Sequence, residues 1–113
     1  MQVDLQPKEP LSQVVFVHDY LQLVFQGRAF TLYNLATYSN GSIELRQGQP
    51  GFCDALVSLI GQNARADALA DSLLLQFSNG SVVSVPVSGA DARGPEAWQF
   101  GQVGGPYVVE QNA

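Results

Sequence analysis

Cysteine, histidine and charged residues are scarce in this sequence. Of the 113 residues, one is cysteine (Cys53), one is histidine (His18), and only 13% are charged. A single cysteine excludes an intrachain disulfide, and these two side chains fall short of the roughly four ligands of a structural zinc site. Calcium-loop, P-loop and dinucleotide-binding spacings are also missing. The sequence therefore predicts no cofactor, no metal site and no catalytic residues.

Basic residues and long apolar runs are equally few. Five Lys and Arg residues are scattered singly against ten Asp and Glu residues, which gives a net charge of −5. Nucleic-acid binding draws on clustered basic residues, so we expect none. The longest aliphatic or aromatic run, Val14 to Val17, is far short of the roughly 20 residues that cross a bilayer, and residues 1–13 lack the features of a secretion signal. We expect a cytoplasmic protein that does not bind membranes.

What the sequence does have is apolar content, at 46% of residues, enough for a chain of this length to form one core. Residues 1–12 contain Pro7 and Pro10 among polar residues and are predicted to form a polar N-terminal arm. Residues 13–110 are predicted to form a single domain.

An internal repeat is the most informative pattern. The segment from Asp19 to Gly27 matches that from Asp71 to Gly80, and each contains Leu-x-Leu-x-Phe followed by a second alternating segment. Alternation with period two indicates strands, so each copy is predicted to be a β-hairpin.

The length of each turn follows from the alternation, because only one loop length places the apolar residues of both strands on the same face of the hairpin. A two-residue Gln26-Gly27 turn pairs Leu23 with Phe30 in the first hairpin. A three-residue loop over residues 78–80 pairs Leu75 with Val83 in the second and places Gly80 at the left-handed position. A further turn is expected at residues 39–42.

One helix is predicted over about residues 50–62, between the repeats. Phe52, Leu56, Leu59 and Ile60 form an apolar stripe at helical spacing, and Gly61 suits the end of a helix. Residues 63–70 fit either a short strand or a loop. Residues 96–100 are expected to form a strand, with residues 107–109 pairing back after a turn.

These elements predict an α+β fold, with a mainly antiparallel sheet built from two similar hairpins and one packed helix. The residues expected in or near one core are Leu21, Leu23, Phe25, Phe30, Leu32, Leu56, Leu59, Ile60, Leu73, Leu75, Phe77, Val83, Val85 and Trp98.

Four residues are the candidates for a ligand site or interface: Glu96, Trp98, Tyr20 and His18. Strict alternation puts Glu96 on the same face as Trp98, at the edge of the core, where it could be a pocket acid or pair with an arginine. His18 could join a nucleophilic mechanism with Cys53, but nothing in the sequence brings the two together. We expect a strand-end histidine and a half-buried cysteine.

The stretch from Val14 to about Val109 resembles a group of small uncharacterised bacterial domains. The resemblance lies in the two Leu-x-Leu-x-Phe hairpins, the central helix ending in Ile60-Gly61, and Glu96-Ala97-Trp98. The group implies no established activity, and this chain lacks its acidic Asp-Gly turn. Small acidic bacterial proteins of this kind often look like immunity or accessory proteins of toxin systems, which is an analogy only.

Together these observations predict a non-enzymatic protein-interaction module, and the most specific form of this prediction is an immunity or accessory protein of a bacterial toxin system. Its acidic surface would steer a basic partner, and a homodimer is plausible because charge is low and sheet edges are expected to be open. The alternative is a small-ligand-binding domain with an aromatic-lined pocket.

Overall fold

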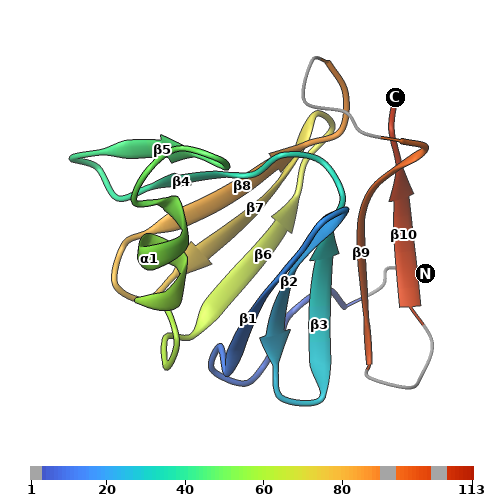
Figure 1. Ribbon diagram of the computed structural model, residues 1–113. Helices are drawn as coiled ribbons and strands as arrows, with labels where there is room; N and C mark the ends of the chain where they lie inside the picture. The colour runs from blue at the N-terminus through green and yellow to red at the C-terminus, as the bar shows by residue number, and fades with distance from the viewer. Residues whose placement is uncertain (1–3, 90–93, 103–106) are drawn as a thin grey trace.

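The computed structural model describes residues 4–89, 94–102 and 107–113. In these residues two five-stranded antiparallel sheets and one short helix surround a single core (Figure 1). Strands account for 49% of the described residues and the helix for 6%. The expected antiparallel strand pairing is confirmed, but the prediction that both hairpins build one sheet is wrong, because each hairpin lies in a sheet of its own. The fold is also dominated by its sheets to a greater degree than the sequence indicated.

Sheet A has the strand order β1-β2-β3-β9-β10. The first predicted hairpin is its β2-β3 pair, in which Leu23 lies opposite Phe30 as expected. The strands are β1 (Gln13–Val17), β2 (Tyr20–Phe25), β3 (Arg28–Leu32), β9 (Glu96–Gln102) and β10 (Tyr107–Gln111). The expected strands over 96–100 and 107–109 are confirmed. The turn predicted between them falls on residues that include 103–106, which lie outside the described part of the chain.

Sheet B has the order β5-β4-β8-β7-β6. Its β7-β8 hairpin pairs Leu75 with Val83 and places Gly80 at φ 93°, which confirms the three-residue loop. Residues 63–70, whose sequence fits either a short strand or a loop, contain strand β6. The strands are β4 (Thr37–Ser39), β5 (Glu44–Arg46), β6 (Ala64–Ala68), β7 (Ser72–Phe77) and β8 (Val82–Pro86).

The repeat extends well beyond the two hairpins. When β1–β5 are matched with β6–β10 in chain order, the two sheets have the same strand order. In each half three strands form a meander, and the following hairpin joins the opposite sheet: β4-β5 pairs with β8, and β9-β10 pairs with β3. The two halves are therefore interlocked, because each contributes the last two strands of the other half's sheet.

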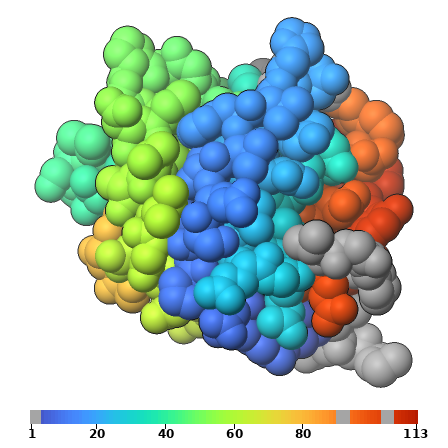
Figure 2. Space-filling model, turned by 60° about the horizontal axis from the view of Figure 1, so that its bottom comes forward, coloured from blue at the N-terminus to red at the C-terminus, as the bar shows by residue number. Residues whose placement is uncertain are grey.

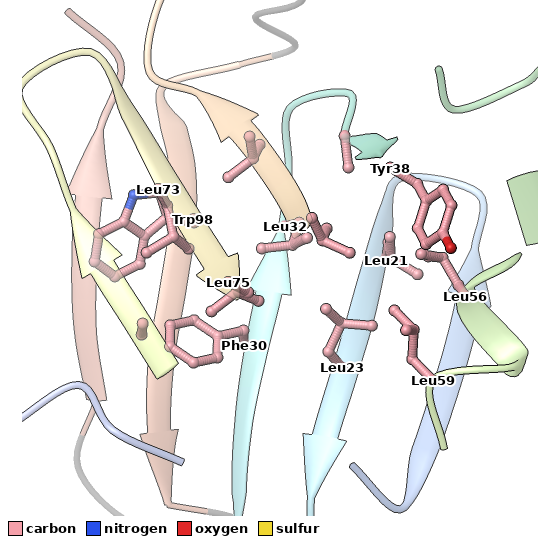
Figure 3. Close-up of a cluster of buried hydrophobic side chains, with 14 of the residues drawn as sticks. Leu21, Leu23, Phe30, Leu32, Tyr38, Leu56, Leu59, Leu73, Leu75 and Trp98 are labelled. Atoms are coloured by element: carbon pink, nitrogen blue, oxygen red, sulfur yellow. The ribbon is translucent and has the colours of Figure 1, made fainter. Parts of the chain in front are cut away.

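The core fills the space between the sheets, where inward side chains of both meet (Figure 3). Every residue predicted to be in the core is buried except Ile60, whose side chain is 45% exposed. The prediction for Ile60 is wrong because the helix that would have turned it inward ends before it.

Helix α1 (Phe52–Val57) is six residues long and does not extend over 50–62 as predicted. Phe52, Leu56 and Leu59 are buried as expected. After Val57 the chain continues as turns that end at Gly61, at φ 96°. The backbone N–H of Gly61 donates to the Leu11 carbonyl (2.8 Å) instead of to a helical carbonyl. Leu59 is therefore buried from a turn and not from a helix.

Two segments close the sandwich between the sheets. Helix α1 contacts β1 in sheet A and β4 in sheet B, and Figure 2 shows the yellow-green residues around α1 beside the blue N-terminal strands. At the opposite side, the amide of Gln6 donates to the carbonyl of Ala66 in β6 and accepts from its N–H. The N-terminal arm is therefore packed on the domain, and its Leu11 is 1% exposed.

Candidate functional site

The outer face of sheet A is the candidate site. Core residues alternate with outward residues along each strand, and the strand register aligns the outward residues into two complete rows across all five strands. The first row is Gln13, Val24, Ala29, Gly101 and Tyr107, and the second is Val15, Gln22, Thr31, Gln99 and Val109. We call these ten residues the glutamine face.

This face is hollowed. An open depression of about 620 Å³ is lined by nine residues of the glutamine face together with Gln26 and Gln102. Small residues, Ala29 and Gly101, lie side by side in the first row, and Tyr107 stands at its end with 62% of its surface exposed. The volume is within the range of small-molecule sites, about 300–1,000 Å³.

No residue of the glutamine face carries a charge, and the internal repeat supplies a comparison. The ten equivalent positions on the outer face of sheet B include four charged residues: Glu44, Arg46, Arg65 and Asp67. Arg65 and Asp67 are 3.4 Å apart there, an ordinary solvated ion pair. The corresponding residues of sheet A are Tyr107, Val109, Gln13 and Val15. Sheet B therefore has a typical water-facing surface, whereas sheet A has an amide, hydroxyl and aromatic one.

Hydrogen bonds orient the central amides. Gln22 Nε2 donates to Thr31 Oγ1 (3.1 Å), and the Tyr33 hydroxyl donates to Gln99 Oε1 (3.3 Å). A glutamine amide has two donor hydrogens and an oxygen that can accept two bonds. Each of these contacts uses one such position, so the amides are held in place with further capacity to bind.

Tyr20, Tyr33 and Glu96 lie at one end of this surface. The rings of Tyr20 and Tyr33 pack edge to face with centroids 6.1 Å apart, and a smaller cleft of about 210 Å³ is lined by Asp19, Tyr33 and Glu96 with Gly94 and Pro95. Partial burial of the Tyr33 hydroxyl, followed by the negative charge of Glu96, raises the pKa of Tyr33 above its ordinary value.

The prediction that Glu96 shares a face with Trp98 is wrong, and a β-bulge is the reason. Glu110 pairs with Trp98, but the next residue, Gln111, pairs with Glu96, so Ala97 is the extra residue in β9. One inserted residue reverses the alternation. Glu96 is therefore directed toward Tyr33 on the outer side, while Trp98 points into the core.

The remaining candidates are elsewhere. Trp98 is 3% exposed and belongs to the core (Figure 3), so it is not a surface anchor. His18 lies in the β1-β2 turn with a side chain 94% exposed, and its Nε2 is 3.7 Å from Asp19 Oδ1. Cys53, expected to be half-buried, is exposed on α1. Of the four predicted site residues, Tyr20 and Glu96 lie near the same residue, Tyr33.

Sequence reasoning missed Gln22, Thr31 and Gln99, the centre of the face. The first hairpin contained a usable signal, since pairing Leu21 with Leu32 and Leu23 with Phe30 necessarily places Gln22 opposite Thr31. Gln99 could not be added, because only the folded structure shows that β9 pairs with β3.

The chain matches no protein-family model, no curated protein and no solved structure. The resemblance to small bacterial domains therefore stays a prediction. In residues 4–89, 94–102 and 107–113, no helix has the length and hydropathy needed to cross a bilayer.

Proposed function

We propose that this domain is a non-enzymatic binding module that recognises an uncharged ligand on the glutamine face. The observation that carries the proposal is the contrast between the two outer faces: four charged positions on sheet B correspond to uncharged positions on sheet A. Burying charge without a partner is costly, so surfaces that bind neutral ligands tend to exclude it. The depression supplies the concave shape that such recognition uses.

The repeat also supplies the experiment. Ala29 in β3 and Val82 in β8 occupy equivalent outward positions, so Ala29→Arg fills the floor of the depression and Val82→Arg is its matched control. Extract of the native host is fractionated, and each fraction is screened for a rise in the Tm of the wild-type protein. We expect active fractions to lose their effect on Ala29→Arg and keep it on Val82→Arg. Equal responses of both variants would refute the assignment of the face.

Salt separates this proposal from toxin neutralisation. A basic partner steered by the net charge of −5 would associate more slowly as salt increases. Binding to an uncharged face should change less than about twofold between low and high salt, because screening acts on charges. The toxin-neutralising role stays a prediction that the same fractions can test.

Self-association is a second candidate, favoured by an exposed apolar edge. Phe16 and Val17 of the edge strand β1 are 44% and 41% exposed, and such edges can pair with another chain. A homodimer through this edge should be lost in a Phe16→Lys variant. Light scattering that shows a monomer at high concentration would refute it.

A further inference from the structure

The chemistry of the glutamine face points to one class of neutral ligand, hydroxyl-rich and extended. Its central accessible polar groups are two amides, Gln22 and Gln99, each able to donate and accept hydrogen bonds. The hydroxyl of Thr31 between them is buried and accepts from Gln22. Sugar hydroxyls also donate and accept, and one amide can bond to two neighbouring hydroxyls. An apolar ligand would leave these groups without partners, which costs binding energy.

The spacing of the face fits a chain of sugar rings. Gln22, Thr31 and Gln99 lie on adjacent strands in one row, and neighbouring strands are about 4.8 Å apart. Successive rings of an extended glycan advance by a similar length. A glycan that crosses the strands would therefore meet Gln22 and Gln99 two strand spacings apart, on either side of the buried Thr31.

The second row of the face supplies the surface on which rings rest. Ala29 and Gly101 carry little or no side chain, so they leave room above the sheet beside the polar row. Tyr107, largely exposed at the end of this row, offers an aromatic ring against which the C–H face of a sugar can stack. The depression therefore combines a low floor, polar side chains and an aromatic end.

We propose that the glutamine face binds a neutral oligosaccharide lying across the strands of sheet A. The inference rests on the proposed function and specifies its ligand. Gln22 and Gln99 hold the hydroxyls, and Tyr107 stacks against a terminal ring. We expect neutral glycans to be preferred to acidic ones, because no lining residue of the depression is a cation that could pair with a carboxylate.

The test is calorimetric titration with cellohexaose, xylohexaose, mannohexaose and laminarihexaose, with an oligogalacturonate as the charged comparison. We expect at least one neutral hexasaccharide to bind and the oligogalacturonate not to bind. Gln22→Ala and Gln99→Ala should each weaken binding about tenfold, the equivalent of one net hydrogen bond of about 1.4 kcal/mol. Gln76→Ala, which removes an amide from the outer face of sheet B, should leave binding unchanged.

Two further outcomes are distinguishable. If none of the four neutral hexasaccharides binds while Ala29→Arg still abolishes the Tm response to host fractions, the sugar assignment is overturned and the proposed function stands. If a hexasaccharide binds but shifts amide resonances of sheet B instead of β2, β3 and β9, both are overturned. Preserved folding of every variant is checked by its unfolding midpoint.

Discussion

Leu75→Ala tests whether the two sheets form one rigid core. Leu75 is 1% exposed, and Figure 3 shows its side chain in the layer between the sheets. Removing three carbon atoms costs about 2.5 kcal/mol at about 0.8 kcal/mol per methylene. The cavity adds to this, because β7 is held by hydrogen-bonded strands on both sides, β6 and β8, and cannot move inward. We expect a total loss of about 3–4 kcal/mol, within the range for buried leucines.

The measurement is urea unfolding followed by the fluorescence of Trp98, the single tryptophan, which lies in the same core. Leu74→Ala is the control, since Leu74 lies on the same strand and points to the opposite, half-exposed side; its cost should stay below about 1 kcal/mol. If Leu75→Ala costs no more than Leu74→Ala, the closed two-sheet core is refuted. The m-value should be unchanged, because the surface exposed on unfolding is the same.

Three further predictions concern a turn, a buried amide and a phenol. Gly80→Ala should lower the free energy of unfolding by about 1–2 kcal/mol, because Gly80 has the left-handed φ of 93° and no neighbouring atom contributes a clash. Gly27 does not have a left-handed φ, so Gly27→Ala should be close to neutral in the same urea assay. Asn34, 1% exposed, donates to the part-buried Pro86 carbonyl (2.7 Å), so Asn34→Ala should cost about 1–3 kcal/mol by removing this bond from the carbonyl. A loss below 0.5 kcal/mol, on the order of a typical surface substitution, would contradict this. The pKa of Tyr33 is raised in the folded state. The contribution of the neutral phenol to the free energy of unfolding is therefore present below about pH 10 and is lost as pH rises through the folded-state pKa. Between pH 8 and 11 the free energy of unfolding should therefore fall less steeply with pH for Tyr33→Phe than for the wild type. Identical slopes would refute the partial burial of this hydroxyl.

The two hairpins and their turns could be predicted from the sequence alone. Their registers follow from alternation and turn length, because a shift of one residue would expose Leu23 or Leu75 to water. The structure has both pairings as predicted, with Gly80 at positive φ. Local chemistry was sufficient here, since each hairpin is contiguous in the chain.

The helix and the bulge were decided by tertiary structure. Leu59 is buried in a turn after α1 because Gly61 bonds to the Leu11 carbonyl, and a periodic stripe cannot distinguish this from a longer helix. Glu96 lies on the outer side, and not on the predicted inner side, because β9 pairs with both β10 and β3 and Ala97 is an extra residue in its pairing with β10. The partner strand β3 lies far from residue 96 in the sequence, so alternation within residues 96–100 could not reveal the bulge.

Part of the candidate site could also be predicted from the sequence, and part depended on the tertiary structure. Alternation within the first hairpin places Gln22 beside Thr31 on the outer side, so half of the face could be derived from residues close in sequence. Gln99 and Tyr107 join it only because β9 and β10 cross from the second half of the chain to pair with β3. Strand pairing over such sequence separations depends on the packing of the whole core, so only the tertiary structure could complete this surface.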